Sequence, residues 1–276
     1  MRKFILHMIP HWFLAIRGTA PRGAAIVLGL LPIALLIFLW WFLTWGAVEE
    51  RAIGPSILPS PKEVILSVPE LVTGRDLLHH IGASMRRVGL SYLLALAVLL
   101  PTGILMGAFG TVRAALEPSM TASGYIPIAT LVPLTMSWFG TDELQKIMFL
   151  AMAFGIYLLP MVLKAIDAVP DVYLRTAFTL GTSRWQSISR VLIPVALPDL
   201  WHAMRLAFGV GWTYLVLAEV VVMVDGLGYL TEISRRRGPR EHIYLVIITI
   251  TLIAWISDLV LERLGGLLFP YRRSRT

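Results

Sequence analysis

The sequence predicts an all-α membrane protein with six transmembrane helices, and three observations support this. Hydrophobic residues make up 57% of the chain, charged residues only 15%, and the mean hydropathy is +0.75, far from the composition of a soluble domain. Apolar runs long enough to cross the hydrocarbon core alternate with polar segments. One polar segment, residues 167–198, interrupts the apolar pattern with three arginines. The expected spans are 24–48, 88–109, 119–139, 147–163, 206–224 and 243–257.

The amino-terminal segment, residues 1–23, is basic and partly apolar. No small-residue cleavage site follows an apolar region of the signal-peptide kind, so we expect an amphipathic cytoplasmic segment on the membrane surface. The first span is uncharged, and Trp40, Trp41 and Trp45 would form an aromatic belt at its outer interface.

Prolines and glycines mark the remaining elements. Pro61 is well placed to begin a short external helix. Pro127 and Pro133 break the third span, and the carbonyls they leave unpaired predict packing against protein. The small residues Gly103, Gly107, Gly209 and Gly211 predict close helix contacts in the second and fifth spans.

The distribution of basic residues favours both termini in the cytoplasm, including the tail 265–276, so the net charge of +7 reflects topology rather than nucleic-acid binding. The bias is weak because four arginines fall in one outer loop. Three interpretations of this cluster stay open: a docking face for a substrate-binding protein, an attractive field for an anionic substrate, or a solvated loop. Its members are Arg235, Arg236, Arg237 and Arg240.

The polar segment predicts two short helices joined at Gly181, where a positive φ costs little, and together they would form a foot projecting from the bilayer. Leu180, Trp185 and Ile188 would give this foot an apolar side. Arg184 and Arg190 could make charge-assisted contacts to a partner. The alternative is an ordinary amphipathic loop on the lipid headgroups.

The stretch RTAFTLGTSRWQSISRVLIPVALP resembles the loop of permease subunits in bacterial ATP-binding-cassette importers, Glu-Ala-Ala, three residues, Gly, nine residues, Ile-x-Leu-Pro. Gly181 holds the glycine position, and Val191, Ile193 and Pro194 hold the closing positions. Arg175 and Thr176 replace the Glu and the first Ala, whereas Ala177 is kept, so a role for that glutamate does not transfer. The resemblance assigns ATPase coupling to Arg175, Ala177, Leu180, Gly181, Thr182, Ser183, Arg184, Trp185, Arg190 and Pro194.

Other stretches between residues 57 and 264 resemble the nitrate, sulfonate and taurine branch of that family: ILPSPKEV, HIGASMRRV, PTGILMGAFG, SWFG and GVGWTYLVLAEVVVMVDGLGYL. The resemblance implies a type I importer permease with a transmembrane domain at 24–264, in the bacterial inner membrane. It implies a second permease copy, two ATPase subunits, an external binding protein and lipid contacts. The substrate would be a small anion such as a sulfonate, taurine, nitrate or bicarbonate.

Catalytic and metal chemistry are not expected in this chain. No Gly-x-x-x-x-Gly-Lys-Ser/Thr sequence occurs, so ATP and Mg would be bound by partner chains. Cysteine is absent. His79 and His80 are adjacent, and His202 and His242 are isolated, a pattern that predicts no metal site.

Glu219 is the only ionisable side chain within the six predicted spans, which makes it a candidate for the pathway, for gating, or for an ion pair between helices. An apolar gate could form from Met136, Trp138, Trp212 and Tyr214, although core or lipid-facing roles explain them equally. An ion-coupled secondary transporter is the alternative function. It would need several intramembrane ionisable residues or a repeated half. An intramembrane enzyme would need a catalytic constellation that the sequence does not show.

Overall fold

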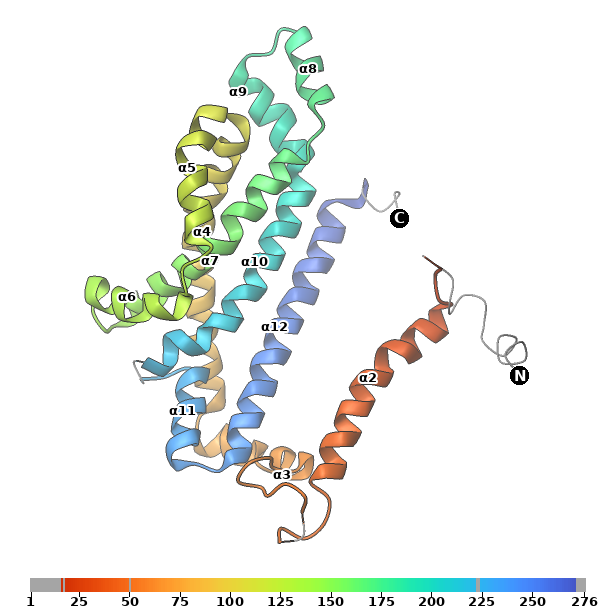
Figure 1. Ribbon diagram of the computed structural model, residues 1–276, viewed down its shortest axis with the longest axis vertical. Helices are drawn as coiled ribbons and strands as arrows, with labels where there is room; N and C mark the ends of the chain where they lie inside the picture. Colours follow the sequence, from red (N-terminus) through yellow and green to blue (C-terminus); the bar gives the residue numbers. More distant parts are fainter. Residues whose placement is uncertain (1–15, 17, 50, 222–223, 272–276) are drawn as a thin grey trace. The chain divides into compact units, whose positions relative to one another are not determined.

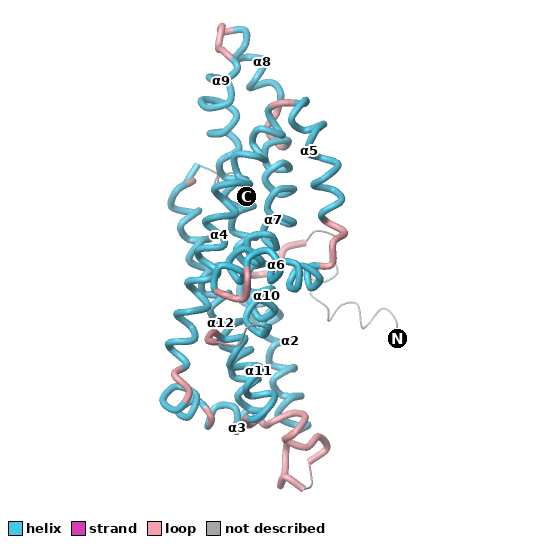
Figure 2. The backbone as a smooth tube through the Cα atoms, turned by 90° about the vertical axis from the view of Figure 1, so that its left-hand side faces the viewer, coloured by secondary structure: helices cyan, strands magenta, loops and turns pink. Residues whose placement is uncertain are grey.

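The computed structural model describes residues 16, 18–49, 51–221 and 224–271. Most of the predicted amino-terminal segment and the end of the basic tail lie outside this range. The described residues form helices joined by loops and turns (Figures 1 and 2). The helices are α2 (Arg22–Leu43), α3 (Pro61–Leu66), α4 (Leu77–Ala108), α5 (Gly110–Ser123), α6 (Leu131–Phe139), α7 (Glu143–Asp167), α8 (Asp171–Thr179), α9 (Arg184–Ser187), α10 (Ile193–Val221), α11 (Leu227–Arg237) and α12 (Arg240–Leu268), with π-helical turns η1 (Glu70–Gly74) and η3 (Ile188–Leu192) and a 3-10 turn η2 (Ile128–Thr130).

The chain divides into two compact units, residues 1–66 and 67–276. In the first unit, α2 has no buried residue, as suits an apolar helix whose neighbours are lipid or another chain. Pro61 begins α3 as predicted, and a reciprocal cap fixes the start of that helix: Ser60 N donates to Glu63 Oε2 (2.8 Å) and Glu63 N donates to Ser60 Oγ (3.3 Å). Arg51 Nη1 lies 2.8 Å from Glu63 Oε1.

Five stretches of helix are long and apolar enough to cross a membrane in the part of the chain that the structure describes. They are α2, α4, α7, the run Arg184–Val221 and α12. The predicted third span at 119–139 is broken at Pro127, as expected, between α5 and α6. Pro127 adopts an extended conformation at this break and cannot donate a backbone hydrogen bond. Pro133 lies in the first turn of α6 and does not break that helix, because a proline in the first turn lacks only a hydrogen bond that the helix would not make there.

The second unit is built on α4, α7 and α10. Helices α4 and α7 run parallel, since Arg87 bonds Glu143 at one end whereas Gly107 faces Ile166 at the other. The chain between them must therefore return across the unit, and α5 and α6 provide that return as two short helices. Figure 2 shows α5 and α6 at different levels, joined by a loop.

Close helix contacts occur at three of the four predicted glycines. A Cβ on Gly103, Gly107 or Gly211 would come within 2.5 Å of a side chain on α7. Gly209 is different, because nothing lies within 4 Å of the corresponding Cβ position. The first three glycines therefore let helices approach more closely than any larger residue would allow.

The helices extend beyond the predicted spans, mostly at their amino ends. Helix α4 begins at Leu77 rather than near residue 88, and α7 begins at Glu143 rather than 147. The predicted outer loop after the fifth span contains α11. A span drawn by hydropathy stops at the first charged residue, whereas a helix can include charged residues, as α4 does with Arg86 and Arg87 and α7 does with Glu143 and Lys146.

In the second unit, helices α8 and α9 lie at one end and α11 lies at the opposite end (Figure 1). The carboxyl end of α12 lies near the α8–α9 end, because Trp201, early in α10, donates its Nε1 to Leu261 O (3.0 Å) and contacts Gly265.

Candidate functional site

The segment between α7 and α10 forms the predicted helix–glycine–helix foot. Gly181 has φ = +81°, a conformation that costs an L-residue about 1–2 kcal/mol. Thr182 N donates to Ala177 O (3.2 Å) and Gly181 N donates to Phe178 O (3.0 Å), the paired bonds of a glycine helix stop. The predicted hinge is therefore confirmed in its geometry.

Helix α9 is fixed immediately after this turn. Ser183 N donates to Gln186 Oε1 (2.9 Å), and Gln186 N donates to Ser183 Oγ (3.4 Å), which completes a capping box. The hydroxyls of Thr182 and Ser187 lie 2.8 Å apart. The direction of α9 relative to α8 is thus set by local hydrogen bonds, and the foot is a defined surface rather than a loose loop.

The predicted contact residues divide into two groups. Leu180 is 79% exposed and Trp185 65% exposed, and Arg184, Arg190 and Pro194 are exposed as well. Ala177 and Ile188 are buried. The expectation that Ile188 contributes to the outer apolar side is wrong, because the π-helical turn η3 begins at this residue and directs it into the core.

Arg175, at the position where the resembling family has glutamate, lies on the exposed surface of α8. Its Nη2 is 3.8 Å from Asp171 Oδ2, and both side chains are about 80% exposed. An exposed pair one helical turn apart contributes little to stability. The guanidinium is therefore free to contact a partner chain.

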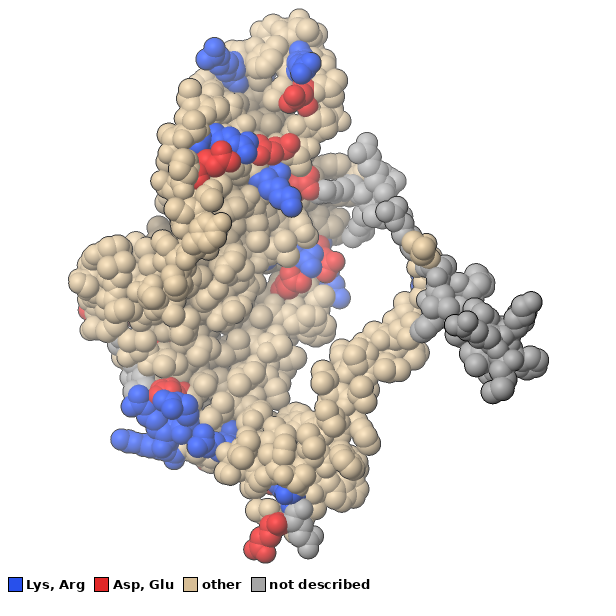
Figure 3. Space-filling model, viewed as in Figure 1, with Lys and Arg blue, Asp and Glu red and all other residues tan. Residues whose placement is uncertain are grey.

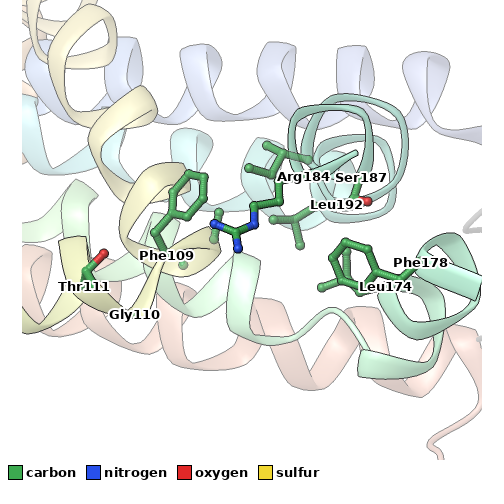
Figure 4. Close-up of a pocket in the computed structure, with 11 residues that line it drawn as sticks. Phe109, Gly110, Thr111, Leu174, Phe178, Arg184, Ser187 and Leu192 are labelled. Carbon is green, nitrogen blue, oxygen red and sulfur yellow. The ribbon is translucent and has the colours of Figure 1, made fainter. Parts of the chain in front are cut away.

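A groove of about 610 Å³ lies beneath the foot (Figure 4). Its walls come from α8, from α9 with η3, and from the α4–α5 junction, residues 107–111. Arg184 reaches into the groove between Phe109 and Phe178 (Figure 4), and Phe109 makes an edge contact with Trp185, with ring centroids 5.9 Å apart. The α4–α5 junction thus belongs to the same surface as the foot. The sequence signal for this role is slight: an aromatic residue followed by Gly110 at the end of a span.

The opposite end of the unit carries the arginine cluster on α11 and the start of α12 (Figure 3). Two arginines are held by Glu232, which is only 5% exposed. Arg235 makes two bonds to its carboxylate (2.6 and 2.7 Å), and Arg236 Nε makes one (2.6 Å). Hydrogen bonds from Arg235 and Arg236 lower the pKa of Glu232 to about 2. Arg237 and Arg240 are exposed.

An ionic cluster around one buried arginine joins three helices and the loop before α11 at this end. Arg87 of α4 is fully buried, and its guanidinium bonds Glu143 of α7 (Nε–Oε2 2.8 Å, Nη2–Oε1 2.6 Å), Glu219 of α10 (Nη1–Oε1 2.7 Å) and Asp225. Lys146, 1% exposed, adds a bond to Glu143 Oε1 (3.0 Å). Glu219 is the only ionisable side chain within the spans as predicted, but α4 and α7 begin earlier than those spans and also include Arg87 and Lys146.

The same cluster fixes the start of α11. Leu227 N donates to Ser84 Oγ (2.9 Å), Gly228 N donates to Glu219 Oε2 (2.8 Å) and Gly226 N donates to His80 Nδ1 (2.9 Å). Gly226 has φ = +106°, and a Cβ there would lie 2.3 Å from the Glu219 carboxylate. Glu219 therefore bonds both Arg87 and the first turn of α11, where a carboxylate also complements the helix dipole.

Comparison with known proteins decides the family. Residues 99–274 match the model of the binding-protein-dependent transport system inner membrane component. The chain belongs to this family. The taurine transport system permease protein TauC of Escherichia coli K12 is 30% identical over 91% of this chain and 92% of its own length. A putative aliphatic sulfonates transport permease protein, SsuC of Bacillus subtilis 168, is 29% identical over 89% and 88%.

Solved importer structures share the fold of this permease. The methionine ABC transporter MetNI, in an inward-facing crystal form, gives a TM-score of 0.65 at 18% identity, over 73% of this chain and 98% of the solved chain. A bacterial alginate ABC transporter in complex with its periplasmic protein gives 0.58 at 17% identity, over 93% and 99%. The permease is thus a transmembrane transport subunit and not an enzyme, and ATP hydrolysis falls to separate ATPase chains.

The predicted gate residues do not share one environment in the permease. Trp212 is buried in the central core, and Met136 packs against that core. Tyr214 shares a hydrogen bond with Tyr157 (hydroxyl oxygens 2.8 Å apart), whereas Trp138 is 58% exposed on α6. For Trp212 this is the core role that the sequence left open as an alternative. A gating role for the other three stays a prediction.

Proposed function

We propose that this permease, paired with a second copy, forms the translocation pathway of an ATP-driven importer for a small anion of the sulfonate class. Two ATPase subunits would bind the foot inside the cell, and a substrate-binding protein would deliver the substrate outside. One observation carries the proposal: a rigid, exposed foot and an arginine-rich face occupy opposite ends of the same helices. The family's requirement for partners on both sides of the membrane is consistent with this arrangement.

The foot has the chemistry of a protein interface. Leu180 and Trp185 offer exposed apolar area, with Arg184 and Arg190 beside them, and aromatic and arginine side chains are enriched at interface centres. Closure of the ATPase pair on ATP would bring the two feet together. The helix pairs would then rock between inward and outward access.

The four arginines of the external face, which would meet an acidic surface of the binding protein, differ in whether Glu232 holds them. Glu232 neutralises one charge and holds Arg235 and Arg236 in place. All four arginines are exposed, but Arg237 and Arg240 are not bonded to Glu232, and we assign the principal contacts with the binding protein to them. Of the three interpretations of the cluster, docking is favoured because a buried carboxylate orders half of it.

The substrate assignment follows the relatives, which are named as taurine and aliphatic sulfonate permeases. The carboxylate of Glu219 is buried and bonded to Arg87, so its negative charge is compensated and is compatible with an anionic substrate. Selection among taurine, alkanesulfonates, nitrate and bicarbonate would fall mainly to the binding protein.

One observation favours the alternative of an ion-coupled transporter. Three carboxylates lie around Arg87, and intramembrane ionisable residues are typical of proton pathways. Family membership argues against it, and the exposed foot would then have no partner. The decisive difference is whether transport consumes ATP.

The test is purification of the permease with its partners, followed by reconstitution into liposomes. We expect an ATPase to copurify, hydrolysis to rise with the binding protein, and uptake to require internal ATP. A ligand screen of the binding protein with taurine, alkanesulfonates, nitrate and bicarbonate would identify the anion. Uptake driven by an ion gradient without an ATPase would refute the importer.

We place the permease in the bacterial inner membrane with both termini in the cytoplasm. The absence of cysteine from the sequence makes this simple to test. A maleimide that cannot cross the membrane should label Arg237→Cys in intact cells and Leu180→Cys only after permeabilisation. The reverse pattern would invert the topology.

A further inference from the structure

The foot lies between α7 and α10, and the ends of these two helices that lie far from the foot are both bonded to one residue. Helix α7 leads into the foot through Asp167, and α10 leaves it at Ile193. At the other end of the unit, α7 begins with Glu143, and Glu219 lies in the last turn of α10. Both carboxylates bond the guanidinium of Arg87. The two arms of the foot are therefore clamped together at the end opposite the foot.

The chemistry of the clamp requires arginine. The five N–H donors of Arg87 have five acceptors: two oxygens of Glu143, one of Glu219, and the side chain and carbonyl of Asp225. Lysine has three donors on a single atom and cannot span three carboxylates in fixed directions. Full burial of the guanidinium makes each of these bonds costly to lose.

The bonded group around Arg87, called the clamp here, also holds the first turn of α11, the helix that carries most of the arginine cluster. Glu219, Ser84 and His80 receive the first backbone N–H groups of α11, and α11 carries the arginine cluster. A force on the arginines would therefore reach α10 through Glu219, and then α4 and α7 through Arg87. Each step is a direct hydrogen bond, and Arg87 and Glu219 are fully buried.

We propose that Arg87 is a positioning residue for transport that links events at the external face to the foot, by joining the outer ends of α7 and α10 to the start of α11. The inference rests on the proposed function, because it assumes a binding protein outside and an ATPase inside. Its new content is the route, which passes through Arg87 near the start of α4, at the end of that helix opposite the foot.

The experiment uses the complete complex with its ATPase subunits, in lipid nanodiscs. Spin labels at Leu180→Cys report the separation of the two feet, and labels at Arg237→Cys report the separation of the two external faces. Distances are measured without nucleotide and with ATP and vanadate. In the otherwise native chain we expect nucleotide to change both distances.

Two variants test the clamp. Arg87→Lys keeps the charge but loses donors. The double variant Arg87→Gln with Glu219→Gln removes the two fully buried charges together, while Glu143 keeps its bond to Lys146 and Asp225 is partly exposed to solvent. Arg205→Gln is the matched control, because Arg205 joins α10 to α12 through Asp258 (2.6 Å) outside the clamp.

In both clamp variants we expect the nucleotide-driven change at Leu180 to persist and that at Arg237 to disappear. Basal ATP hydrolysis should stay near that of the unaltered complex. Its stimulation by the binding protein, assayed with taurine, should fall about 5-fold or more, the range of coupling between sites. The control should keep both distance changes.

Several results would overturn the proposal. The external change could survive in the variants, the unaltered complex could show none, or both distances could lose their response together, as expected of a merely structural residue. Failure of both variants to assemble would make the clamp a folding requirement only. Absence of a copurifying ATPase would instead refute the proposed function, so the two failures are distinguishable.

Discussion

Arg87 of α4 and Glu219 of α10 form a fully buried ion pair, with Nη1 and Oε1 2.7 Å apart and neither side chain exposed. Removing one partner of such a pair typically costs about 3–5 kcal/mol, because the other charge is left buried without compensation. Glu219 has three further contacts to lose, two with Ser84 and one with Gly228 N.

We therefore expect Glu219→Ala to lower the folding stability of the permease by about 3–5 kcal/mol. Glu219→Gln should cost less, since an amide oxygen can still accept from Gly228 N. Thermal unfolding of the complex in detergent measures both, with uptake assayed in parallel. Normal assembly and normal transport in Glu219→Gln would exclude both a gating and a structural role.

The conformation of Gly181 predicts a local effect on coupling. Gly181→Ala should strain the turn by about 1–2 kcal/mol and misdirect α9, so that ATP hydrolysis by the assembled complex decreases. Gly209→Ala is the control, because nothing lies within 4 Å of its added Cβ. Equal hydrolysis in the two variants would show that the foot tolerates another hinge geometry.

The groove beneath the foot predicts that Phe109 supports Trp185. An aromatic pair contributes about 0.5–1.5 kcal/mol beyond its buried area, so Phe109→Ala should weaken ATPase binding by about 2- to 10-fold. Leu116→Ala, which removes a 38% exposed side chain from α5, serves as the control. Copurification yield and titration of free ATPase subunits would measure the difference. Identical affinities would remove the α4–α5 junction from the interface.

The ion pairs of Glu232 predict how the external face responds to acid. Arg235 and Arg236 depress the pKa of its carboxyl from 4.5 to about 2. A depressed pKa stabilises the folded state above the ordinary value, and that contribution is lost as the pH falls through about 2. Between pH 8 and pH 5, Glu232 should stay ionised, so docking of the binding protein should not change through this residue. Comparison with Glu232→Gln over this range is the check. A pH dependence that disappears in Glu232→Gln would contradict the assignment.

The sequence predicted the elements that local chemistry determines. Gly181 needed only its own conformational freedom, and Pro61 only its fixed φ, to mark a hinge and a helix start. Pro127 likewise marked the break in the third span, but the hydropathy of 119–139 does not reveal that its first part belongs to α5, which begins at Gly110. Arg87 was missed for a different reason. Its burial depends on Glu143 and Glu219, which are 56 and 132 residues away in the sequence, and only the fold brings them together. The four arginines looked alike in sequence, whereas the buried Glu232 makes them unequal.

The difference between the arginines that Glu232 bonds and the two that it does not bond leads to a prediction about docking. Exposed charges at an interface affect chiefly the association rate and its salt dependence. The double variant Arg237→Glu with Arg240→Glu should therefore slow association of the binding protein by about 10-fold or more at low salt, since electrostatic steering raises on-rates by about 10- to 1000-fold.

Surface plasmon resonance on nanodisc-embedded complex can follow this association at increasing salt. The difference between the double variant and the unaltered permease should shrink as salt screens the charges. Arg263→Glu makes the same kind of charge change near the carboxyl end of α12, far from α11, and should leave association unchanged. If Arg235→Ala and Arg236→Ala slowed association more than the double variant does, the arginines bonded to Glu232 would be the docking residues, and our assignment of Arg237 and Arg240 would be wrong.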